Sequence, residues 1–167
     1  MTSTSVDYTS IVTQSWQNVY ELISDKNNVD DPIQSGSSRK MVYSREPDKG
    51  IEFQGYPYVI VTTPEVRFGK SSLDGSRREV VWEIEVEIHS SDDIPELRGN
   101  GQAYFKQIAD DIIKTFNDVT NRKVLRGYGM GTFFPNLEIK EVTTIDQEVV
   151  YMNRFRLIFS KRLKVSV

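Results

Sequence analysis

Three glutamates that alternate along an apolar segment are the residues best suited to chemistry in this sequence. Glu83, Glu85 and Glu87 stand between large apolar residues, which is the pattern of a strand with one buried face. Carboxylates two residues apart on a strand lie roughly 6.5–7 Å apart, within the range that inverting glycosidases use. A glycosidase, however, gives its two acids different environments, whereas these three are equivalent. We interpret them as the outward half of an amphipathic strand and expect no catalytic role.

The remaining candidates for a catalytic or metal site lack partners. His89 is the single histidine and the chain has no cysteine, whereas catalytic triads and most transition-metal sites need a histidine together with further ligands or partners. Asp92 and Asp93 alone supply too few oxygen ligands for a calcium site. We therefore predict that the chain has no catalytic residue, no cofactor and no metal.

Two glycine-bearing segments do not match nucleotide-binding motifs. The Gly127–Gly131 run follows an expected helix rather than a strand and lacks the G-x-G-x-x-G spacing. The Gly69–Gly75 loop has no Walker lysine and no helix after it. We interpret residues 127–134 as a flexible connector.

Length and composition are typical of one globular domain spanning residues 1–167. The chain has 27% charged and 38% hydrophobic residues, which argues against disorder. It lacks both the ~18-residue apolar run of a membrane span and the start of a secretion signal. We expect the protein to be made in the cytosol and to have no membrane partner.

The net charge of −3 conceals an uneven distribution. Between Glu79 and Leu97 there are seven acids and no lysine or arginine, and no acid follows Glu148. The basic residues of the C-terminal segment are Arg154, Arg156, Lys161, Arg162 and Lys164. A basic strand could bind nucleic acid, but cross-strand pairing or simple solvation of these residues is the reading we favour.

Hydrophobic periodicity predicts two helices and several strands. Apolar residues recur at helical spacing over residues 6–24 and 102–119. Strands are expected at 58–63, 82–88, 137–144 and 149–159, with a short one at 40–44. This order predicts an α+β fold, with a mixed, mainly antiparallel sheet and two helices packed on one face. The expected core is Trp82, Ile84, Val86 and Ile88 against Phe105, Ile108, Ile112 and Phe116.

Two long irregular segments are the expected interface. Residues 67–78 resemble a hairpin tip and contain Arg67, Lys70, Arg77 and Arg78, and the connector ends in Phe133 and Phe134. Loops of this length are uncommon unless they have a function. We expect both segments to be mobile in the isolated chain and ordered by a partner. The outward glutamates of the 82–88 strand complete the expected interface.

The sequence resembles the tail terminator (tail completion) proteins of tailed bacteriophages. The resemblance rests on the N-terminal amphipathic helix leading into Asn28–Pro32, on the Gly55–Val61 segment, on the acid-alternating strand, and on a helix followed by a closing strand pair. It implies a structural virion protein, without catalytic residues, that forms a ring, usually a hexamer, at the end of the tail tube. Such a ring ends tail growth and joins the tail to the head-side connector, while DNA passes through its bore.

Three other functions stay open. A neck or stopper protein of the head–tail joint is the closest alternative within the same biology. A small nucleic-acid-binding module would use the basic C-terminal strand, and a hydrolase would use the glutamates.

Overall fold

The computed structural model describes residues 8–33, 38–91, 100–134, 140–143 and 149–164. Within them the predicted α+β class is confirmed, since three helices accompany one mixed, mainly antiparallel sheet. The elements in order are α1 (Tyr8–Ser24), β1 (Val42–Tyr43), β2 (Tyr58–Val61), β3 (Glu65–Ser71), β4 (Arg77–Ser91), α2 (Gly101–Asn117), α3 (Val119–Gly127), β5 (Met130–Phe134), β6 (Lys140–Thr143) and β7 (Val149–Lys164).

Two long antiparallel strands form the centre of the sheet. β4 and β7 pair along their whole length, from Arg77 opposite Lys164 to Ser91 opposite Val150. The shorter strands follow one another along the two outer edges of this pair: β2 and β3 pair with β4, whereas β5 and β6 pair with β7. β1 adds to β2 in parallel. At about 3.3 Å per residue, the central strands of 15 and 16 residues make an elongated molecule.

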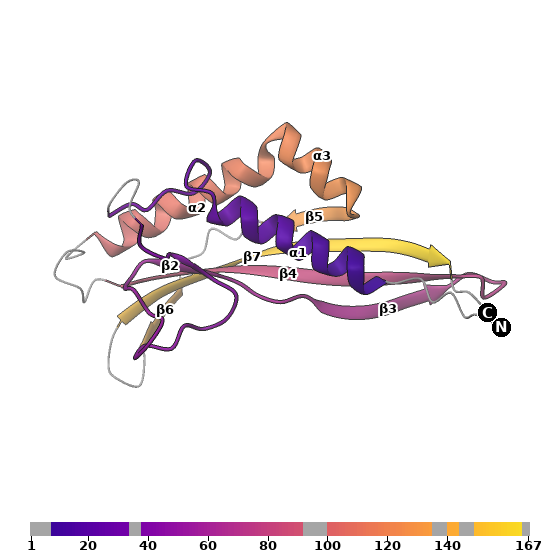
Figure 1. The fold of residues 1–167 in the computed structure, drawn as a ribbon, viewed down its shortest axis with the longest axis horizontal. Helices are drawn as coiled ribbons and strands as arrows, with labels where there is room; N and C mark the ends of the chain where they lie inside the picture. The colour runs from indigo at the N-terminus through magenta and orange to yellow at the C-terminus, as the bar shows by residue number, and fades with distance from the viewer. Residues whose placement is uncertain (1–7, 34–37, 92–99, 135–139, 144–148, 165–167) are drawn as a thin grey trace.

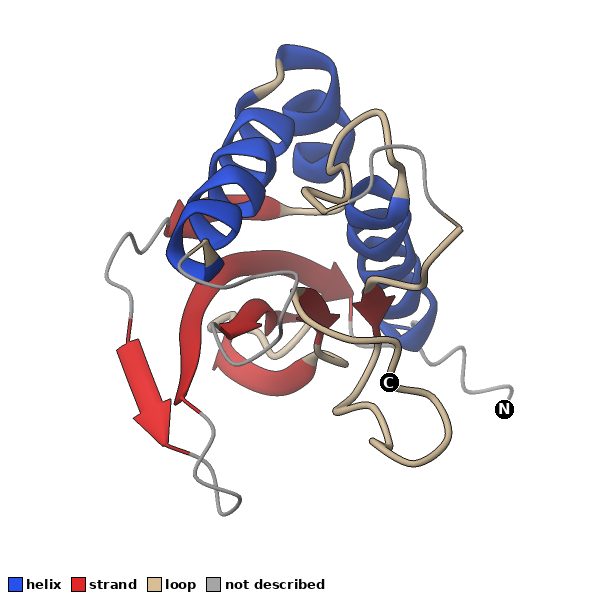
Figure 2. Cartoon of the chain, turned by 90° about the vertical axis from the view of Figure 1, so that its left-hand side faces the viewer, coloured by secondary structure: helices blue, strands red, loops and turns tan. Residues whose placement is uncertain are grey.

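All three helices lie on one face of the curved sheet (Figures 1 and 2). The predicted core is confirmed there. The eight residues are at most 1% exposed: Trp82, Ile84, Val86, Ile88, Phe105, Ile108, Ile112 and Phe116. Because side chains alternate along a strand, burial of the even-numbered residues of β4 turns its glutamates to the opposite face. This register is the one that the sequence predicted.

Helix α1 is attached to the sheet by directional bonds as well as by packing. The indole nitrogen of Trp82 donates to the Ser15 hydroxyl over 2.8 Å, and that hydroxyl donates to the Val12 carbonyl. Tyr20 donates to the carbonyl of Val42. These bonds satisfy polar groups that burial would otherwise leave without partners.

A second, aromatic cluster covers part of the opposite face of the sheet. The 44–57 segment folds over it (Figure 1), and the cluster contains Tyr43, Tyr56, Tyr58, Ile60 and Val150. Arg39 fastens this region, because its guanidinium donates to the carbonyls of Gly55 and Pro57 and pairs with the buried Asp31 at 2.7 Å. The two segments around Asp31 and Gly55, on which the resemblance partly rests, are therefore in contact.

The structure corrects three details of the expected secondary structure. The helix expected at 102–119 is confirmed as α2, which ends at Asn117, but the following helix α3 was not predicted; Asp118 separates the two and caps α3 by accepting from the Asn121 amide. The hairpin expected at 67–78 is present, but its irregular tip is shorter than expected, because β3 extends to Ser71 and β4 begins at Arg77. The flexible connector expected at 127–134 is the end of α3 followed by β5.

The glycine run at the end of α3 has a structural explanation. Gly129 has a φ of 103°, and a Cβ atom there would lie 2.5 Å from the Ser160 carbonyl oxygen. Its carbonyl accepts from the Ser160 amide. A tight helix-to-strand turn against β7 therefore requires glycine at this position. The strand expected at 137–144 is observed as β6, and residues 135–139 and the turn expected at 146–147 lie outside the described residues.

Candidate interaction surface

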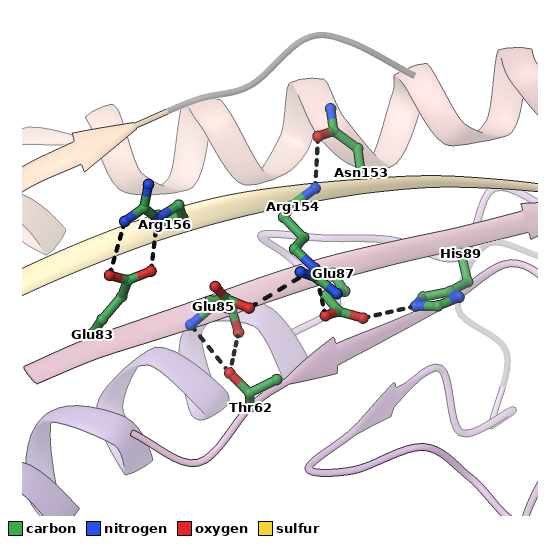
Figure 3. A network of polar contacts seen from close by, with 8 residues as sticks. All are labelled: Thr62, Glu83, Glu85, Glu87, His89, Asn153, Arg154 and Arg156. Carbon is green, nitrogen blue, oxygen red and sulfur yellow. Dashed lines mark hydrogen bonds and ion pairs between the residues drawn. The ribbon is translucent and has the colours of Figure 1, made fainter. Parts of the chain in front are cut away.

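The three glutamates of β4 form a ladder of ion pairs with the arginines of β7 (Figure 3). Arg156 binds Glu83 with two hydrogen bonds, of 2.6 and 3.0 Å. Arg154 lies 2.8 Å from a Glu87 oxygen and 3.8 Å from Glu85. The expected cross-strand pairing of the basic strand is therefore confirmed for its first two arginines. It also means that the acidic stripe offers a partner much less free charge than the sequence suggests.

The environments of the three carboxyl groups are not equivalent, contrary to our expectation. The hydrogen bonds from Arg156 lower the pKa of Glu83, and the hydrogen bond from His89 at 3.1 Å, with the nearby Arg154, lowers that of Glu87. Burial raises the pKa of Glu85, against the opposing charge of Arg154. The ladder thus places an acid that resists ionisation between two that ionise readily.

His89 links this ladder to the aromatic cluster. Its ring stacks on Tyr58 with centroids 4.8 Å apart, and the Tyr58 hydroxyl donates to Glu46 over 2.8 Å. Burial and the neighbouring Glu46 carboxylate raise the pKa of Tyr58. His89 is 8% exposed, so it is a partnered residue at the end of a strand.

The tip of the β3–β4 hairpin is a compact turn. Ser72 and Ser76 both donate to the Asp74 carboxylate, and these bonds lower its pKa from 3.8 to about 2. The Ser72 amide donates to the Arg77 carbonyl. Leu73, at the apex, is fully exposed. Beyond Phe68, which packs edge-on against Tyr8 at the start of α1, the hairpin projects past the described part of that helix (Figure 1).

A cationic groove of about 300 Å³ lies at the base of this turn. It is lined by Lys70, Ser71, Ser72, Leu73, Arg77, Glu79 and Arg162. Lys70, Arg77 and Arg162 are exposed and form no ion pair within the described part of the chain. With three cations and one carboxylate, Glu79, the groove joins a net positive charge to an exposed leucine, a combination suited to an acidic partner with an apolar contact.

The other predicted interface residues are placed differently. Arg67 lies 3.7 Å from Glu65, and Arg78 covers the Phe68 ring at 4.9 Å; both arginines are exposed. Phe133 was expected to belong to the interface, but it packs on Phe116 and Phe155 with ring centroids 5.2 and 6.1 Å away. β5 carries it toward the helices, where it extends the core. The backbone of Phe134 pairs with that of Arg156, and its side chain lies outside the described residues.

A second cavity, of about 250 Å³, lies between the end of α1 and β1. Tyr20, Ile23 and Met41 make it largely apolar, and the paired Asp31 and Arg39 form one wall. Neither cavity includes a glutamate of the ladder.

Positive charge is concentrated at one end of the molecule. The hairpin (65–79), α3 with its cap (118–126) and the end of β7 (161–164) carry ten cations and four carboxylates. The three segments are neighbours. Arg77 stands opposite Lys164 in the backbone pairing of β4 with β7, and the Lys161 ammonium donates to the Gly127 carbonyl at the end of α3. The rest of the chain has eleven cations and twenty carboxylates. We call the three segments together the basic end.

Comparison with known families and curated proteins finds no match for this sequence. No helix in the described ranges is long and apolar enough to cross a membrane. Among the same residues, no group of three or more histidine, aspartate or glutamate side chains could hold a metal ion.

Proposed function

We propose that this chain is a structural assembly protein of tailed bacteriophages, a tail terminator that forms a ring on the end of the tail tube. In this proposal the cationic groove of the β3–β4 hairpin, within the basic end of one copy, docks against an acidic surface of the next copy, and the completed ring joins the tube to the head-side connector. No catalytic role is assigned. A neck or stopper protein of the same joint is the alternative within this biology.

The observation that carries the proposal is the projecting hairpin with its exposed Leu73 and with Lys70 and Arg77, which form no ion pair among the described residues. An ordered turn of this kind gives the chain no core packing, because its apical leucine touches solvent. The charge separation adds directionality, since a molecule with one basic end and an acidic remainder associates head to tail. Heterologous contacts of this kind close into rings when the rotation between subunits allows it.

Hydrolysis by the glutamates is supported less well. Glu83 and Glu87 are already bound by arginines, and a catalytic carboxylate must be available to the substrate. The unequal pKa values are the one catalytic trait of the ladder, and the cross-strand ion pairs explain them without a substrate.

Mass photometry of the purified chain, alone and mixed with tail tubes, tests the proposal. We expect closed oligomers of one fixed subunit number, and electron micrographs with an added ring at one end of each tube. The sample without tubes is the control, because it shows whether the chain forms oligomers only in the presence of the tube surface. A chain that stays monomeric in both samples, with bare tube ends, would contradict the proposed function.

A further inference from the structure

We propose that the outward face of α3 binds the phosphate backbone of double-stranded DNA without reading its sequence. This face consists of Arg122, Lys123 and Arg126, all of which are exposed. Arg122 and Arg126 are one turn apart and Lys123 lies beside them, so their charges point the same way. Within the described residues, none of the three has an ion-pair partner.

The helix is firmly positioned for such a role. Leu125 is fully buried, and the Asn121 side chain donates to the Thr115 carbonyl of α2 over 3.0 Å. Asp118 caps the first turn, and Lys161 binds the last carbonyl of the helix. These contacts hold the helix at its start, along its buried face and at its end, so the exposed Arg122, Lys123 and Arg126 lie on a solvent-facing side that is fixed in direction.

The charge pattern of α3 differs from that of a helix whose charges serve only solubility. In α2, Lys106, Asp110 and Lys114 alternate in sign at a spacing of four residues, and such pairs stabilise a helix. Arg122 and Arg126 have the same spacing with the same sign, which destabilises the helix by a similar amount. An anionic ligand would relieve this repulsion.

DNA is favoured over an acidic protein because of the shape of the face. The surface of the helix is convex, no acid lies among its cations, and its exposed large apolar side chains are Val119 and Val124, at 81% and 44% exposed. Protein interfaces instead have an apolar core with a charged rim, whereas lysine and arginine contacts to phosphate need no such core. The acidic remainder of the chain opposes binding little, because charges beyond about 8–10 Å are screened at physiological salt.

The test is the salt dependence of binding to a short fluorescent duplex, measured by anisotropy with the full chain. Each phosphate contact contributes a slope of about −0.9 to log K against log salt. Arg122→Gln/Arg126→Gln should therefore reduce the slope by about 2, and Arg122→Lys/Arg126→Lys should restore it. The matched control is Lys26→Gln/Lys106→Gln, which removes two exposed cations elsewhere and should leave the slope unchanged. Circular dichroism confirms that each variant is folded.

Three results would overturn the inference. They are an absence of duplex binding by the unsubstituted chain at low salt, equal slopes for the α3 variant and the control variant, and loss of self-association rather than of DNA binding in the α3 variant. The last result would assign this face to a protein partner. Ring formation is measured separately, so DNA binding by a chain that forms no ring would support this inference and contradict the proposed function.

Discussion

The ladder residues on the open face of the sheet act in opposite directions on stability. Glu83 and Glu87 have lowered pKa values because they bind an arginine or a histidine, so the folded chain favours their ionised forms. Glu85 has a raised pKa because it is partly buried between them, so the folded chain favours its neutral form. A row of chemically identical side chains therefore contains two that stabilise the fold at neutral pH and one that does not.

Replacement of the glutamates tests this assignment. At neutral pH, Glu83→Gln and Glu87→Gln should each lower the free energy of unfolding by about 1 kcal/mol, the upper range for partly exposed ion pairs. Glu85→Gln should leave it unchanged or raise it. A carboxyl whose folded pKa is lowered stabilises the fold above its usual pKa of 4.5 and loses that effect as the pH falls through the folded value. For Glu85, whose folded pKa is raised, stabilisation is present below 4.5 and lost as the pH rises.

Urea unfolding at neutral pH and at a pH well below 4.5 measures these differences. The deficits of the Glu83 and Glu87 variants should shrink in acid, since the unsubstituted carboxyls are then protonated as well. A Glu85 variant that is the least stable of the three at neutral pH would show that the ladder is assigned incorrectly.

At the scale of secondary-structure elements, the attachment of α1 to the sheet depends on the buried hydrogen bond from Trp82 to Ser15. Ser15→Ala should lower the free energy of unfolding by about 1–3 kcal/mol, because it leaves the Trp82 indole N–H buried without an acceptor. In a Trp82→Phe background the same change should cost much less, since no donor remains. Chemical denaturation of the four chains gives the coupling energy. Equal costs in both backgrounds would mean that the bond does not contribute to the attachment.

The elements that were predicted correctly are those whose apolar pattern reflects their own burial. β4 alternates because one face covers the core, and α1 and α2 have apolar stripes for the same reason. β3 and α3 lack such patterns. β3 is an edge strand with most side chains exposed, and α3 buries one apolar side chain, Leu125. Backbone pairing with β4 and a cap at Asp118 form these elements, and neither leaves a hydrophobic period in the sequence.

The candidate surface was predictable in composition but not in arrangement. The cations at 67–78 and at the C-terminal end are visible in the sequence, as is the acidic stripe. Only the register of β4 against β7 shows that Arg154 and Arg156 neutralise the stripe, while Arg162 joins Arg77 in the groove. Phe133 was misassigned because glycines precede it, although β5 turns its ring into the core.

At the scale of the whole molecule, the basic end should make self-association depend on salt. Its ten cations and four carboxylates face a remainder with an excess of nine negative charges, so copies attract when one basic end meets another copy's acidic surface. Light scattering at increasing salt should show the oligomer dissociating, because at 0.1 M salt exposed charges more than about 10 Å apart no longer attract each other appreciably.

Arg77→Glu/Arg162→Glu reverses two cations of the groove and should weaken association at low salt. Lys26→Glu/Lys106→Glu alters the net charge equally and should not. Association that is insensitive to salt, or weakened equally by both pairs of substitutions, would rule out docking through the groove, because only a local contact distinguishes two chains of identical net charge.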